Sequence, residues 1–199
     1  MLPDHQSTKR LPKAALPLEP PGGVLVWLVV ALELLTFAAG IGVFLHAKGT
    51  HPGEFAAGAQ GLDQPLALAN TLLLLTGGWF MGMAVAAISQ NRGLAGARWL
   101  GLAIVAGIGF LGLKGVEWAG KIGAGASFGG DHFYTIYFAL TGFHFAHVAA
   151  AVVILTYLRH AVLRGRYTAA DYFDIESGGI FWHMCDLIWL LLYPVIYLI

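Results

Sequence analysis

The chain has 199 residues, of which 58% are hydrophobic and 11% are charged, and its mean hydropathy is +0.72. So apolar a composition predicts an all-α integral membrane protein that has the bilayer as its solvent. The formal net charge is zero, which disfavours a nucleic-acid partner, and the single cysteine, Cys185, excludes an intrachain disulfide and a Cys-x-x-Cys metal site.

Residues 1–23 differ from the rest of the chain, because they are rich in proline and carry Lys9, Arg10 and Lys13. We predict that they form a flexible cytoplasmic tail. A cleaved signal peptide is disfavoured, since the apolar run that follows is too long and no small-residue cleavage site closes it.

Five long apolar segments follow, at residues 24–45, 66–88, 99–119, 133–158 and 180–199. Each is long enough to cross a hydrocarbon core about 30 Å thick as a helix that rises about 1.5 Å per residue. The stretches between them are short and rich in Gly, Pro, Asp, Asn and Arg, which predicts turns. Residues 24–199 are therefore expected to form one domain, a bundle of five transmembrane helices.

The distribution of Lys and Arg predicts the orientation of this bundle. One side has only Lys48 and Lys121, whereas the other has eight basic residues: Lys9, Arg10, Lys13, Arg92, Arg98, Arg159, Arg164 and Arg166. The positive-inside rule then predicts a cytoplasmic N-terminus and a periplasmic C-terminus, in a membrane of the bacterial inner (cytoplasmic) type.

Glu33 lies near the middle of the first apolar segment, among leucines. A carboxylate at this depth is either protonated or hydrogen-bonded by neighbouring helices, because an unpaired ion is heavily penalised in apolar surroundings. Two interpretations stay open. Glu33 is either a proton-linked or lipid-linked carboxyl, or a neutral residue that holds helices together by hydrogen bonds.

Two pairs of residues mark the second and third segments. Gly78 and Gly82 form a G-x-x-x-G pattern, which would let a neighbouring backbone approach closely. Lys114 and Glu117 lie three residues apart on one helix face and can neutralise each other, so we predict a structural pair.

Three histidines are candidate ligands. His144 and His147 lie on one face of the fourth segment, and His183 lies in the fifth. Two histidines on one helix face point the same way, whereas a haem with two histidine ligands needs them on opposite sides. We therefore predict hydrogen bonds between helices in place of a metal or haem site.

The last segment carries a polar face. At about 100° per residue, Glu176, His183, Asp186 and Tyr193 fall within a sector of roughly 80°. An exposed charge in mid-membrane costs on the order of 2.5 to 3.5 kcal/mol on insertion scales, so this face is expected to meet protein and not lipid.

Each of the five segments contains a short motif around its polar residues. The motifs are ALELLTFAAG with Glu33, ANTLLLLTGG with Asn70, FLGLKGVEW with Lys114 and Glu117, YFALTGFHFAHV with His144 and His147, and ESGGIFWHMCDLIW with Glu176, His183 and Asp186. In this order the motifs resemble subunit III of the haem–copper oxidase superfamily, in a short five-helix form.

The resemblance implies a non-catalytic accessory subunit with no haem, copper or active site of its own. Such a subunit packs against a catalytic haem-containing membrane subunit, binds phospholipid near the carboxylate matched by Glu33, and supports stability and proton uptake. The remaining polar residues of the motifs would then be structural contacts between helices. Lys114 and the HMCD sequence are most similar to the branch associated with nitric oxide reductase, so oxygen and nitric oxide both stay open as the substrate of the partner.

Two other functions remain as alternatives. One is a small membrane haem-binding or quinone-binding redox protein that uses His144, His147 and His183. The other is a proton-coupled transporter with Glu33 as the carrier carboxyl, although transporters typically contain inverted repeats and broken helices.

Overall fold

The computed structural model describes residues 20–198, and within that range the chain is helical with no β-strand. The elements are α1 (Gly23–Thr50), α2 (Pro52–Gln60), α3 (Gln64–Ile88), α4 (Gly93–Gly123), α5 (His132–Leu163), α6 (Phe173–Tyr193) and the π-helical end η1 (Pro194–Leu198). Five helical runs, α1, α3, α4, α5 and α6 with η1, are long and apolar enough to cross a membrane. The predicted all-α fold with five membrane spans is thus confirmed.

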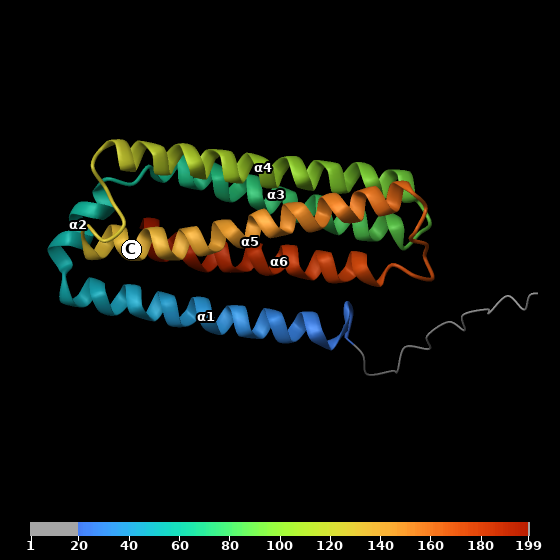
Figure 1. The fold of residues 1–199 in the computed structure, drawn as a ribbon, viewed down its shortest axis with the longest axis horizontal. Helices are drawn as coiled ribbons and strands as arrows, with labels where there is room; N and C mark the ends of the chain where they lie inside the picture. Colours follow the sequence, from blue (N-terminus) through green and yellow to red (C-terminus); the bar gives the residue numbers. More distant parts are fainter. Residues whose placement is uncertain (1–19, 199) are drawn as a thin grey trace, which may run out of the picture.

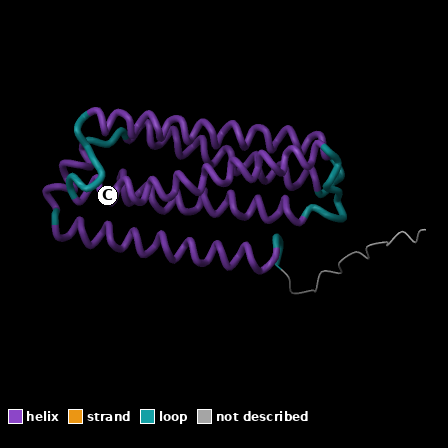
Figure 2. The backbone as a smooth tube through the Cα atoms, in the orientation of Figure 1, coloured by secondary structure: helices purple, strands orange, loops and turns teal. Residues whose placement is uncertain are grey.

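The long helices run along one axis, and the loops gather at the two ends of the molecule (Figure 2). α3, α4, α5 and α6 pack into a four-helix bundle, and α1 lies along its outside against α5 and α6 (Figure 1). The first described residues and the C-terminus lie at opposite ends, as five spans require (Figure 1).

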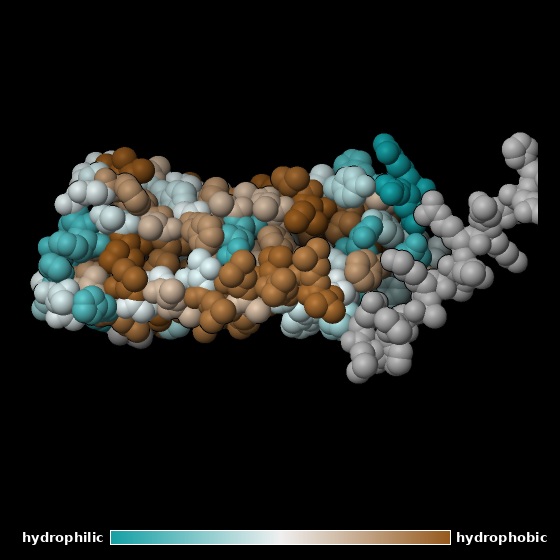
Figure 3. Space-filling model, turned by 60° about the horizontal axis from the view of Figure 1, so that its bottom comes forward, coloured by the Kyte–Doolittle hydropathy of each residue, from teal (hydrophilic) through white to brown (hydrophobic). Residues whose placement is uncertain are grey.

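Apolar and hydrophilic side chains occupy different parts of the surface. Apolar side chains dominate the middle of the long axis, and hydrophilic ones gather at both ends (Figure 3). α1 is the most exposed of the five spans, because only four of its residues are buried: Val30, Phe37, Phe44 and Ala47. The chain is therefore a multi-pass membrane protein.

Charged residues are unequally shared between the two ends. Among the described residues, five arginines (Arg92, Arg98, Arg159, Arg164 and Arg166) lie at or near the end where α1 begins, whereas Lys48 and Lys121 lie toward the other end. The basic residues of the tail lie outside the described residues. The orientation across the membrane stays a prediction.

The prediction of a plain turn after the first span is wrong, because this stretch contains α2. Pro52 occupies the first turn of α2, where its missing N–H is not needed. Phe55 is buried, with its ring centroid 5.0 Å from that of Phe44 and 5.4 Å from that of Phe133. α2 therefore joins the end of α1 to the start of α5.

A hydrogen-bonded carboxylate strengthens this junction. Glu54 accepts the backbone N–H of His132 at 3.0 Å, and the His132 ring lies 3.1 Å away. These two contacts lower the pKa of the Glu54 carboxyl from its ordinary value. Aspartates cap the helices that follow, since Asp63 accepts the N–H of Leu66 and Asp131 that of Tyr134.

Glycines shape the centre of the bundle around one indole ring. A Cβ atom on Gly77 would lie 2.8 Å from the ring of Trp182, and one on Gly107 would lie 2.9 Å from it. Trp182 itself is 1% exposed. The two glycines therefore leave the space in which α6 packs its tryptophan between α3 and α4.

The α2 junction gives a stability test. A Cβ atom on Gly58 would overlap the Phe133 ring, whereas one on Gly53, in the same helix, meets nothing within 4 Å. We expect Gly58→Ala to lower the free energy of unfolding by about 1–3 kcal/mol through overpacking. The control Gly53→Ala should leave it unchanged or raise it by up to about 1 kcal/mol. Thermal unfolding in detergent measures both, and equal stability of the two variants would contradict this packing.

Candidate functional site

A buried ion pair lies on α4. Lys114 and Glu117 face the bundle interior, with Lys114 Nζ 3.0 Å from Glu117 Oε2, and they are only 1% and 6% exposed. Their spacing of three residues puts the two side chains on one helix face. The structure therefore brings together the two residues that the sequence paired.

Two tyrosines complete this cluster from other elements. Tyr137 of α5 and Tyr197 of η1 each donate a hydrogen bond from Oη to Glu117 Oε1 at 2.8 Å. Lys114 Nζ donates to Tyr137 Oη at 3.2 Å, and also to Tyr197 Oη. All three N–H groups of the ammonium thus have an acceptor, which is what a buried cation requires.

Aromatic rings enclose the ammonium group. Lys114 Nζ lies 4.9 to 5.2 Å from the ring centroids of Tyr137, Trp189 and Tyr197. Trp189 in turn donates from Nε1 to Thr71 Oγ1 of α3 at 2.9 Å. The cluster therefore links α3, α4, α5 and the C-terminal end.

The sequence did not identify Tyr197 as a member of this cluster. The π-helical turn that starts at Pro194 carries the Tyr197 hydroxyl to the ion pair. Gln64 holds this turn by donating to the Tyr197 carbonyl at 2.8 Å. A proline inside an apolar run marks such irregular turns, and it was the available signal.

His144 is the most deeply buried histidine. It is 0% exposed, its ring stacks on Trp189 with centroids 5.1 Å apart, and Phe110 and Phe37 meet it edge-on. Neither ring nitrogen is hydrogen-bonded to a residue of the described part of the chain. The expected role of His144 as a polar contact between helices stays a prediction.

Asn70 of α3 is also buried, at 1% exposure. Its amide oxygen and nitrogen have no hydrogen-bond partner between residues 20 and 198. Its expected role as a polar contact between helices stays untested.

Glu33 pairs with His147 across two helices. Glu33 Oε2 of α1 lies 3.3 Å from His147 Nε2 of α5, and the side chains are 19% and 13% exposed. His147 Nδ1 lies 2.8 Å from the Phe143 carbonyl, which only accepts, so Nδ1 carries a hydrogen. Glu33 Oε2 has no hydrogen-bond partner among residues 20–198, so this contact is a close approach of two ionisable groups and not a hydrogen bond.

The polar face predicted on α6 is divided in the structure. Glu176 is partly buried in the first helical turn, ten residues from Asp186. His183 Nδ1 lies 3.3 Å from Asp186 Oδ2, but the side chain of Asp186 is 9% exposed and that of His183 is 54% exposed. Asp186 is therefore buried within this chain, whereas His183 lies at its surface, and the expectation that this face meets protein stays a prediction.

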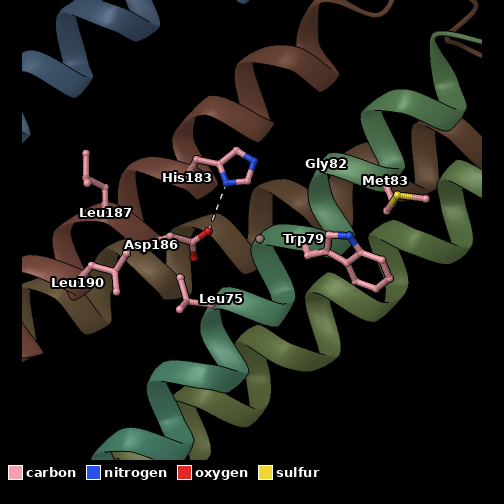
Figure 4. A pocket seen from close by; sticks show the side chains of 9 residues that line it. Leu75, Trp79, Gly82, Met83, His183, Asp186, Leu187 and Leu190 are labelled. Carbon is pink, nitrogen blue, oxygen red and sulfur yellow. Dashed lines mark hydrogen bonds and ion pairs between the residues drawn. The ribbon is translucent and has the colours of Figure 1, made fainter.

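The His183–Asp186 pair lies in a hollow between α3 and α6. The hollow is lined by Leu75, Gly78, Trp79, Gly82 and Met83 of α3, and by His183, Asp186, Leu187 and Leu190 of α6 (Figure 4).

The histidines do not form a ligand set. His144 lies among aromatic rings, His147 beside Glu33, and His183 at the surface. Among residues 20–198, no group of three or more His, Cys, Asp or Glu side chains is arranged to hold a metal ion.

Comparison with known proteins agrees with this arrangement of five helices. The family model described as cytochrome c oxidase subunit III matches residues 25–199, which include all five spans. The chain belongs to the cytochrome c oxidase subunit III family.

Individual relatives of this subunit III family member are distant. "Probable cytochrome c oxidase subunit 3" of Mycobacterium bovis is 24% identical over 89% of the chain and 86% of that protein. "Heme-copper oxidase subunit I+III" of Aeropyrum pernix is 26% identical over 87% of the chain but 22% of its own length. "Cytochrome c oxidase subunit 3" of Synechocystis sp. is 32% identical over 34% of the chain and 29% of that protein. The chain thus spans less than a third of the last two proteins.

The enclosed ion pair gives a second stability test. Lys114→Met leaves the Glu117 carboxylate buried without its cation, so we expect a loss of about 3–5 kcal/mol in the free energy of unfolding. The double variant Lys114→Met/Glu117→Gln should recover much of that loss, because both charges are gone and the tyrosine hydroxyls keep an acceptor. Thermal unfolding in detergent measures all three proteins. A single variant as stable as the wild type would show that the pair does not hold the bundle.

Proposed function

We propose that the chain is a non-catalytic accessory subunit of a haem–copper respiratory complex, packed against a catalytic haem-containing subunit in a bacterial-type inner membrane. The observation that carries the proposal is the subunit III family match across all five spans. The Lys114 cluster supports it, because its ionisable groups bind one another and join helices. We assign no haem or copper to this chain.

The name of the Aeropyrum pernix relative supports the choice of partner. That protein is called "Heme-copper oxidase subunit I+III", so its name joins the two subunits in one protein. We propose that this chain makes the corresponding association as a separate polypeptide.

The pairing of Glu33 with His147 supports a proton-linked role for Glu33. The carboxyl and the imidazole lie 3.3 Å apart, and both side chains remain partly exposed. A carboxyl so placed is able to exchange a proton with the surface of the protein. We propose that it lies beside bound phospholipid and assists proton uptake by the catalytic subunit.

The branch of the family follows from the motif around Lys114 and from HMCD in α6. Both resemble subunits associated with nitric oxide reductase. We therefore propose two alternative reactions for the partner subunit, which are the reduction of nitric oxide and the reduction of oxygen. The identity of the partner distinguishes them.

Co-purification tests the proposed function directly. The tagged full-length chain, extracted from its native membrane in a mild detergent, should carry a haem-containing subunit at a one-to-one ratio, and the complex should show a Soret band. After separation from the complex, the chain itself should be colourless. A stoichiometric haem in the separated chain would overturn the proposal in favour of the redox-protein alternative, with His144→Leu and His183→Leu then abolishing the band.

Replacing Glu33 tests the proton-linked role. Glu33→Gln keeps hydrogen-bonding capacity but removes ionisation, so we expect normal assembly and a faster loss of activity during repeated turnover of the complex. Glu54→Gln is the matched control, because Glu54 lies in α2 outside the spans. Turnover followed to exhaustion measures the effect, and equal lifetimes of both variants would leave Glu33 as a packing residue.

A further inference from the structure

His183 has an unusual position for a polar side chain. It lies ten residues into the span Phe173–Leu198, which has 26 residues. At a helical rise of about 1.5 Å, this is roughly 15 Å from one end of a run about 39 Å long, close to mid-membrane. Its neighbours Trp182 and Met184 are buried, whereas the side chain of His183 is 54% exposed on the outside of the chain.

Asp186 adds an unpaired buried atom at the same place. The residue is 7% exposed, its Oδ2 faces His183, and its Oδ1 has no hydrogen-bond partner among the residues described. Gly78 makes room for this carboxylate, because a Cβ atom there would overlap Asp186 Oδ2. A buried acceptor without a donor costs about 1–3 kcal/mol, so the hollow calls for a donor from outside the chain.

The shape of the hollow fits a helix. Gly82 leaves its floor open, since a Cβ atom there would meet nothing within 4 Å. Trp79, Leu187 and Leu190 form an apolar rim and are 59%, 44% and 42% exposed (Figure 4). Transmembrane helices approach one another closely at small residues such as glycine, and polar side chains hydrogen-bond between them. The hollow has both features, inside an apolar rim.

We infer that the α3–α6 hollow is the docking surface for a transmembrane helix of the catalytic subunit, which brings a hydroxyl or carboxamide side chain to His183 and Asp186 at mid-membrane. Such a side chain can donate to Asp186 Oδ1 and also pair with the outward nitrogen of His183. A lipid does not fit this description, because its headgroup lies about 15 Å away and its acyl chain has no donor. The inference rests on the proposed function, and it adds which face of this chain meets its partner.

Filling the hollow tests the inference. Gly82→Leu places a side chain on the open floor, where its Cβ atom meets nothing within 4 Å, and should reduce recovery of the haem subunit with the tagged chain by about tenfold or more. Gly112→Leu on α4 is the matched control, because a Cβ atom there also meets nothing within 4 Å, and it should recover the subunit as the wild type does. Thermal unfolding of each separated chain checks that both variants fold.

A photo-crosslinking amino acid at Leu190 identifies the occupant, with Val153 on the exposed face of α5 as the control position. We expect a crosslink from position 190 to a helix of the haem subunit that has a hydroxyl or carboxamide residue near its middle, and none from position 153. Crosslinks from position 190 only to lipid or to a second copy of this chain would overturn the inference, as would normal recovery of the haem subunit with Gly82→Leu. In both cases the proposed function stands. If the wild-type chain recovers no haem subunit, the proposed function and the inference fall together.

Discussion

The bundle depends on one constraint, which is that a charge inside the membrane needs a complete set of partners. Lys114 and Glu117 meet it most fully, because the ammonium and the carboxylate bind each other and the hydroxyls of Tyr137 and Tyr197. The two tyrosines come from α5 and η1, so their contacts with the ion pair fix how α4, α5 and the C-terminal turn sit together. Removing any one partner leaves a buried charge or hydroxyl unsatisfied. The cluster therefore favours this one arrangement of the helices over others.

The polar groups become less enclosed toward the outside of the molecule, and their proposed roles change with their position. Lys114 and Glu117 lie inside the bundle and have a structural role. Glu33 and His147 lie between the outer helix α1 and the bundle, where both side chains remain partly exposed. His183 and Asp186 lie between α3 and α6 at the surface, where Asp186 Oδ1 has no hydrogen-bond partner within the described residues. These environments fit the proposed accessory subunit, which would hold its helices together and present one face to a partner.

The sequence predicted the five spans because their lengths and apolar composition are set by the thickness of the bilayer. It also predicted the pairing of Lys114 with Glu117, since three-residue spacing fixes two side chains on one face. It did not predict α2, because nine residues with a weak apolar pattern resemble a turn, nor the contact of Tyr197, which depends on the π-helical turn after Pro194. The surroundings of His144 and the exposure of His183 were missed for a different reason: helical periodicity gives the direction of a side chain but not what lies opposite.

The chain supplies the partners of its buried Lys114–Glu117 ion pair from its own residues, and we propose that it leaves the α3–α6 hollow for a partner. An electron cryomicroscopy map of the complex purified through this chain tests both statements. We expect a protein helix over Gly82 and His183, with a polar side chain at Asp186, and a closed Lys114 cluster with no added group. Acyl-chain density in the hollow, with the haem subunit bound to another face, would contradict this expectation.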